Sequence, residues 1–112
     1  MDGESIVFKL KADFFKALAH PLRLALIERL KNGEMSVGQL VSALEVEQSS
    51  ISKHLAILKQ AGILHSRQEK VTVYYTIRDQ DIFKVLNPII DILGKKLKES
   101  ERILAHLGRR KP

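Results

Sequence analysis

Residues 36–77 read SVGQLVSALEVEQSSISKHLAILKQAGILHSRQEKVTVYYTI, and the architecture follows from this stretch. Its first part has apolar residues at helical spacing in two blocks, over residues 37–44 and 49–61. The run Glu45-Val46-Glu47 between the two blocks leaves room only for a tight turn. The pattern therefore predicts two short helices joined by a turn, a helix-turn-helix over residues 36–61.

Both ends of this unit carry residues that start or stop helices. Ser36 is followed three residues later by Gln39, which is the spacing of a capping box at the start of a helix. Gly62 is placed to end the second helix, since glycine readily adopts the left-handed backbone conformation found there. These signals agree with the limits of the apolar blocks.

After this glycine the apolar residues change to a period of two, which is typical of strands. Residues 63–68 and 71–77 are predicted to pair as a hairpin with Glu69 and Lys70 at its tip. The predicted fold class is mainly α with one small two-stranded antiparallel hairpin (α+β). A helix-turn-helix followed by such a hairpin, or wing, over residues 63–77 is a winged helix-turn-helix.

The segment before this unit is predicted to form two helices. Residues 5–19 carry apolar residues on two stripes of a helix, which is more apolar surface than one small core needs. His20-Pro21 ends that helix, because the residue before a proline disfavours the α region. The next helix is predicted over residues 22–30. The surplus apolar surface of the first helix indicates a partner chain.

The segment after the hairpin is predicted to be helical over residues 79–107, with Asp79 as its cap. Asn87-Pro88 is predicted to interrupt it and to start a new helix, because proline lacks the backbone N–H that a helix interior needs. With no linker and no repeat, the chain is predicted to be a single domain over residues 1–112.

Charges are unevenly distributed along the chain. Its 112 residues carry a formal net charge of +6 and no cysteine. Residues 48–78 hold five basic side chains and one carboxylate, whereas residues 1–47 hold six basic and seven acidic side chains. A basic segment nearly free of carboxylates suits a surface that binds phosphates. The lack of cysteine excludes disulfides, zinc ribbons and thiol chemistry.

The second helix of the unit and the hairpin carry the candidate site. An α-helix fits the major groove of DNA, where Gln pairs with adenine and Lys reaches guanine or phosphate. Arg67 and Lys70 are predicted to reach a neighbouring phosphate or the minor groove. For His54, which lies next to the buried side of the helix, a phosphate contact and a structural role are both open. The candidate DNA-binding residues are Gln48, Ser49, Ser50, Ser52, Lys53, His54, Arg67 and Lys70.

Three runs of the chain resemble the ArsR/SmtB family of bacterial and archaeal transcriptional repressors. They are FFKALAHPLRLALIERL, QLVSALEVEQSSISKHLAILKQAGIL and HSRQEKVTVYYTI. The resemblance implies a homodimer paired through its first and last helices, here residues 5–19 and 79–107. It also implies binding to an imperfect inverted repeat in double-stranded operator DNA, and release of that DNA when an inducer binds.

Relatives in this family bind metal at positions where this chain departs from the family pattern. The family run Glu-Leu-Cys-Val-Cys-Asp-Leu corresponds to residues 34–40, where Ser36, Gly38 and Gln39 replace both thiols and the acid. A second family site needs histidines on the last helix, which holds only His106. No metal or other cofactor is therefore predicted. The switch stays open among a small-molecule inducer, pH, and no inducer at all.

Other function classes compete with a transcriptional regulator. A protein-docking module and a nucleic-acid-binding module without sequence preference are the alternatives, and the second predicts salt-sensitive but unselective binding. No enzyme is predicted, because the chain has no glycine-rich phosphate loop and no nucleophile elbow. Asp2 and Glu4 stand where a signal peptide would be basic, and no apolar stretch reaches the length of a membrane span. A cytoplasmic protein with no membrane partner is predicted.

Overall fold

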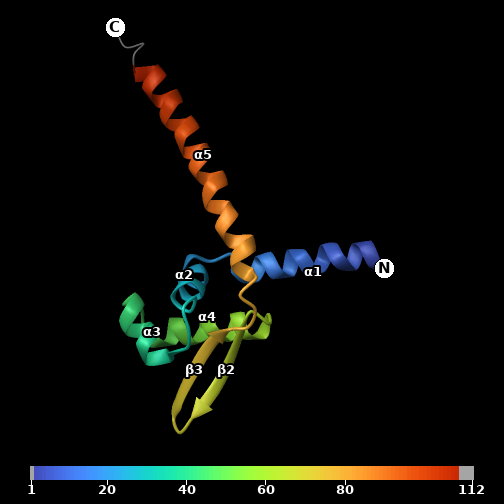
Figure 1. Ribbon diagram of the computed structural model, residues 1–112, viewed down its shortest axis with the longest axis vertical. Coiled ribbons are helices and arrows are strands. Elements are labelled where there is room, and N and C mark those ends of the chain that lie inside the picture. Colours follow the sequence, from blue (N-terminus) through green and yellow to red (C-terminus); the bar gives the residue numbers. More distant parts are fainter. Residues whose placement is uncertain (1, 109–112) are drawn as a thin grey trace. The chain divides into compact units, whose positions relative to one another are not determined.

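The computed structural model describes residues 2–108, which form five helices and a three-stranded sheet (Figure 1). The elements in chain order are α1 (Gly3–Leu18), α2 (Pro21–Arg29), β1 (Met35–Ser36), α3 (Val37–Leu44), α4 (Gln48–Gln60), β2 (Leu64–Glu69), β3 (Thr72–Ile77) and α5 (Ile82–Gly108). The chain divides into two compact units, one ending at Asp79 and the other beginning at Gln80. No helix in the described part is long and apolar enough to cross a membrane.

The starts of α2 and α3 follow from capping side chains in the sequence. The predicted capping box is confirmed, since Gln39 Oε1 accepts from the Ser36 N–H at 2.8 Å and Ser36 Oγ accepts from the Gln39 N–H at 3.1 Å. His20 Nδ1 accepts from the Leu22 N–H at 3.0 Å and so caps α2, whose first residue is Pro21. These bonds satisfy backbone donors that a helix start leaves without partners.

Gly62 ends α4 as predicted. Its φ is +77°, and its N–H donates to the Lys59 carbonyl at 3.0 Å. The next N–H, of Ile63, donates to the Leu58 carbonyl at 3.0 Å, which completes a Schellman motif. The chain thereby turns directly from α4 into the sheet.

Gly62→Ala is expected to lower the free energy of unfolding by about 1 kcal/mol, because a side chain is strained at positive φ. Nothing lies within 4 Å of a Cβ placed at Gly62, so the cost is one of backbone conformation alone. Urea unfolding measures it. Gly38→Ala is the control, since its Cβ meets only Ser36 Oγ at 3.9 Å and alanine suits the helical backbone of α3, so stability should stay equal or rise. Equal stability of both variants would contradict this account of the turn.

The predicted hairpin is confirmed as β2 and β3, and a third strand that was not predicted joins it. The sheet has three antiparallel strands in the order β1-β3-β2, with Met35 opposite Tyr75 and Ser36 opposite Tyr74. Strand β1 has only two residues, so it leaves no period-two pattern in the sequence. It pairs because the loop into α3 runs beside the exposed edge of β3.

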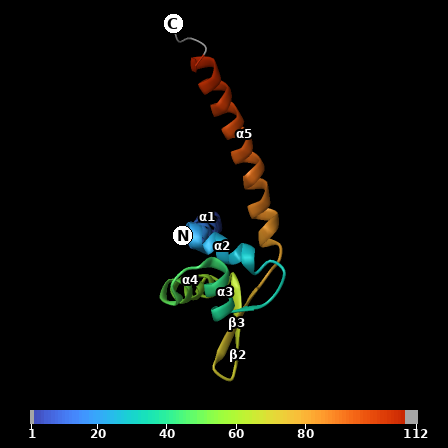
Figure 2. The ribbon, with the colours of Figure 1, turned by 90° about the vertical axis from the view of Figure 1, so that its left-hand side faces the viewer.

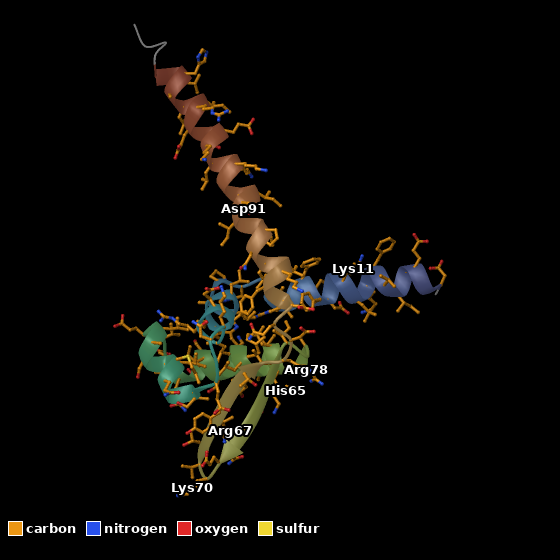
Figure 3. All side chains as sticks on the ribbon, in the orientation of Figure 1. Lys11, His65, Arg67, Lys70, Arg78 and Asp91 are labelled. Atoms are coloured by element: carbon orange, nitrogen blue, oxygen red, sulfur yellow. The ribbon has the colours of Figure 1, made fainter. Side chains whose placement is uncertain are left out.

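The hairpin tip lies one residue later than predicted. Glu69 still pairs with Thr72, so Lys70 and Val71 form the two-residue turn. Lys70 has a φ of +57°, which a tight hairpin turn demands and which glycine or asparagine usually supplies. The charged side chain therefore stands at the outermost point of the hairpin (Figure 3).

The core of the first unit lies between the helices and the inner face of the sheet. Figures 1 and 2 show α3 and α4 in contact, with the hairpin extending from beneath α4. Ile51, Leu55 and Leu58 are fully buried and form the inward face of α4. The fully buried large side chains are Leu26, Ile27, Leu30, Leu40, Ile51, Leu55, Leu58 and Leu64. Burial of this apolar surface fixes α4 on the sheet.

Helix α5 corrects two predicted features. It begins at Ile82 rather than at Asp79, and it continues through Pro88 without interruption. Proline at this position removes the N–H that would donate to the Lys84 carbonyl, and its ring crowds that carbonyl. Lys84 is exposed, so water can bond that carbonyl, and the predicted break at Asn87-Pro88 is wrong.

Candidate nucleic-acid interface

The first two turns of α4 combine a buried apolar face with an exposed polar one. Ile51 and Leu55 point into the core, whereas Gln48, Ser52 and Lys53 are exposed. Ser49 is exposed as well, and Ser50 is half-buried. Five of the eight predicted residues thus lie together on one short stretch of helix, in the arrangement that a major groove accepts.

The start of α4 leaves backbone donors without a side-chain cap. Glu47 is the N-cap residue, and its carboxylate makes no hydrogen bond to the first turn. The free N–H groups and the helix dipole together favour an anion at this end. This feature adds to the side chains of Gln48 and Ser49, which lie at the same end.

A groove of about 460 Å³ separates the start of α4 from the hairpin. Gln48 and Ser52 of α4 line one side of it, and Val73 and Tyr75 of β3 line the other. Gln68 is opposite Val73 in the register and therefore shares this face of the sheet. Gln68 is exposed and was not singled out from the sequence. Side chains alternate between the two faces of a strand, so the sequence could have placed Gln68 on the face opposite to that of Arg67.

The two predicted cations of the hairpin differ in their surroundings. Lys70 is exposed at the tip, and Arg67 lies about midway along the hairpin (Figure 3). Arg67 Nε and Nη2 donate to the two carboxylate oxygens of Glu34, both at 2.6 Å, and Nη1 donates to Glu69 at 3.0 Å. Its guanidinium carbon also lies 4.4 Å from the centre of the Tyr74 ring. The positive charge of Arg67 is thus already paired twice.

These contacts stabilise the charged forms of both partners. The hydrogen bond from Arg67 holds the pKa of Glu34 below its usual value. Bonds to Glu34 and then Glu69 raise the pKa of Arg67 further above its already high value. The pair stays ionised throughout the physiological range.

His54 lies inside the protein although it belongs to α4. Its side chain is 8% exposed, and Nδ1 accepts from Arg23 Nε at 3.1 Å. The His20 ring lies 4.2 Å away, centre to centre. Arg23 Nη1 also donates to the carbonyls of Lys16 and Ala17, at 3.2 and 3.1 Å, at the end of α1. Of the two roles left open for His54, burial and these bonds favour the structural one.

Burial lowers the pKa of His54, and the nearby charges of His20, Arg23 and Lys53 lower it further. At a pH below 6.5, the ordinary pKa of histidine, His54 is protonated in the unfolded chain but stays neutral in the folded protein until the pH reaches its lower folded pKa. The stability from neutral His54 is therefore present above pH 6.5 and lost as pH falls towards the folded pKa.

We expect the free energy of unfolding to fall between about pH 7 and about pH 5, and His54→Gln to flatten this dependence. Glutamine offers Arg23 an acceptor but takes up no proton. Urea unfolding at each pH measures the effect. His65→Gln is the matched control, because His65 is exposed on β2 and should leave the slope as it is. Equal slopes for wild type and His54→Gln would contradict the assignment.

The positions that carry thiols in the family have other roles here. Ser36 is buried and caps α3, and Gly38 lines the groove. Among residues 2–108, no three His, Asp or Glu side chains gather closely enough to hold a metal ion.

Sequence comparisons identify relatives over most of the chain. Residues 20–66 match the model of the arsR family of bacterial regulatory proteins. The uncharacterized HTH-type transcriptional regulator Rv0081 of Mycobacterium tuberculosis is 35% identical over 108 residues, which cover 96% of this chain and 94% of that protein. The biofilm growth-associated repressor of Agrobacterium fabrum is 35% identical over 81 residues, which cover 72% of this chain and 69% of that protein.

Solved structures share the fold. The crystal structure of Rv0081 has a TM-score of 0.73 at 37% identity and covers 87% of this chain and 96% of its own. The solution structure of Mb0332 from Mycobacterium bovis, a homodimeric winged helix-turn-helix DNA-binding domain, has a TM-score of 0.75 at 25% identity and covers 88% and 92%. With its capping box, exposed α4 face and hairpin, this chain belongs to the arsR family of bacterial regulatory proteins.

Proposed function

We propose that the protein is a homodimeric transcriptional repressor that binds an imperfect inverted repeat in double-stranded DNA. The observation that carries the proposal is the exposed polar face at the start of α4, set on a fully buried apolar face. Such a helix presents hydrogen-bonding side chains at a fixed depth, which base readout requires. A repressor of this kind acts where bacterial DNA lies, in the cytoplasm, and needs no catalytic step.

In the proposed complex, α4 enters the major groove. Gln48 and Ser52 read base edges, while Ser49, Ser50 and the free N–H groups at the helix start hold a phosphate. Lys53 reaches guanine or phosphate from the next turn. Lys70 at the hairpin tip contacts the backbone beside the site or enters the minor groove. The basic excess of residues 48–78 supports this approach.

The proposed dimer forms through the exposed apolar residues of α1 and α5. Phe8 is 61% exposed and Leu104 is 68% exposed, and residues of this size seldom stay in water as a continuous stripe. The relative Mb0332 is a homodimer, which supports the same assembly here. Two-fold symmetry then demands two half-sites whose centres lie about 10 bp apart or a multiple of that.

Selection of the purified protein on random duplexes of about 30 bp tests this proposal at about 0.15 M salt. Enrichment of an inverted repeat is the expected outcome. Retention without enrichment would show backbone binding alone, and absence of retention would favour a protein-docking module. A reporter gene placed behind the enriched repeat should then be silenced; its activation would overturn the assignment as a repressor.

On the enriched duplex, Gln48→Ala is expected to cost about 1–3 kcal/mol at one base position and little at others. Lys53→Ala should weaken binding to all sequences and reduce the salt slope by about one. Fluorescence anisotropy at several salt concentrations measures both. Lys59→Ala is the control, because Lys59 is exposed in the last turn of the same helix. An equal loss on every sequence for Gln48→Ala would contradict base readout.

A further inference from the structure

One side chain ties the hairpin to the helix-turn-helix from outside. Arg67 belongs to β2, and its guanidinium stacks over the ring of Tyr74 on the central strand β3. The same guanidinium donates to the carboxylate of Glu34, the residue directly before β1. Arg67 therefore crosses all three strands of the sheet. Glu34 precedes β1 and Ser36, the residue that caps α3. The contact thus joins the hairpin to the point where the helix-turn-helix begins.

The register places this contact on the face of the sheet that points away from α4. Arg67 is opposite Tyr74, whereas the neighbouring pair is Gln68 and Val73. Side chains alternate between the two faces of a strand. Val73 lines the groove beside Gln48 and Ser52, so Arg67 belongs to the other face. A phosphate held near the start of α4 is not on the side where Arg67 points.

We propose that Arg67 and Glu34 form a clamp that positions the hairpin for DNA binding, and that Arg67 is a positioning residue rather than a phosphate ligand. The proposal rests on the DNA-binding function proposed above. It replaces the expectation that Arg67 contacts a phosphate. It also means that tight DNA binding requires Glu34, although Glu34 is acidic. Lys70 is then the cation of the hairpin that meets DNA.

Charge supports this division of roles. A phosphate at Arg67 would meet the carboxylates of Glu34 and Glu69, which already accept from its three donor nitrogens. A bidentate guanidinium–carboxylate pair is also geometrically specific, which a strut between a loop and a hairpin needs. Lys70 lies beyond this cluster at the tip, where its ammonium group is exposed.

The clamp is tested first without DNA, by hydrogen exchange of the β1 and β3 amides in the full chain. Glu34→Gln and Arg67→Gln are each expected to speed this exchange by about threefold to fivefold, the range for a well-oriented surface pair. Unchanged exchange in both single variants would overturn the clamp, whatever the protein does on DNA.

The second test uses the duplex enriched in the selection. Glu34→Gln and Arg67→Gln should each weaken binding about threefold to fivefold with an unchanged salt slope, and Arg67→Lys should fail to restore affinity. Lys70→Gln is the control, with a salt slope lower by about one. A lower slope for Arg67→Gln together with tighter binding for Glu34→Gln would make Arg67 a phosphate ligand and overturn the proposal. If no duplex is enriched, the DNA-binding function fails while the exchange test still decides the clamp.

Discussion

Replacing Leu97 and Leu104 of α5 by aspartate will leave the protein monomeric and lower its affinity for a duplex with two half-sites by about a hundredfold or more. Five large side chains of α5 recur at spacings of three, four, seven and three residues, which places them on one face of the helix, as in a helix–helix seam. They are between 52% and 70% exposed in the single chain: Ile90, Leu93, Leu97, Leu104 and Leu107. A second copy buries them in the proposed dimer, and two buried carboxylates cannot be accommodated there.

Sedimentation equilibrium measures the change in mass, and anisotropy measures the change in affinity. Lys95→Asp is the control, because Lys95 is exposed on the opposite side of the same helix. It alters the charge of α5 without entering the seam, so the mass should stay that of a dimer. A doubly substituted protein that remained dimeric would show that α5 contributes little to assembly.

Arg23→Met is expected to lower the free energy of unfolding by about 1–3 kcal/mol, the cost of leaving buried polar groups without partners. Arg23 reaches three acceptors, which are Nδ1 of buried His54 and two carbonyls at the end of α1. Methionine keeps much of the apolar stem but donates to none of them. Helix α4 and the end of α1 thus lose the side chain that joins them.

Urea unfolding at about pH 7.5 measures this loss, since His54 is then neutral. Arg29→Met is the matched control on the same helix. Arg29 is exposed in the last turn of α2, so its removal should change stability by less than about 0.5 kcal/mol. A similar loss for both variants would mean that any arginine on α2 stabilises the protein through its charge alone.

Features that depend on neighbouring residues were predictable from the sequence. Ser36 with Gln39 and the glycine at Gly62 mark helix ends through contacts within a few residues, and both are confirmed. The buried face of α4 follows from the spacing of three apolar residues. Such signals survive in any tertiary context because the backbone groups that they satisfy are local.

Features that depend on distant partners were missed. Arg67 and Glu34 are 33 residues apart, and Arg23 and His54 are 31 apart, so no local pattern pairs them. Strand β1 exists only through β3, and α5 continues through Pro88 although the sequence around this proline is typical of a break. The candidate site was therefore predictable on α4, where position along one helix decides exposure, and less so on the hairpin.

The exposed seam of α5 has a consequence for the cell. In the proposed dimer, this seam makes DNA binding depend on the concentration of the protein, because dimers form in proportion to the square of the monomer concentration. While monomers predominate, a doubling of expression raises the number of competent dimers about fourfold. Genes controlled through such a protein therefore respond more than proportionally to its synthesis. The monomer concentration at which dimers begin to predominate depends on the apolar surface that the residues from Ile90 to Leu107 bury.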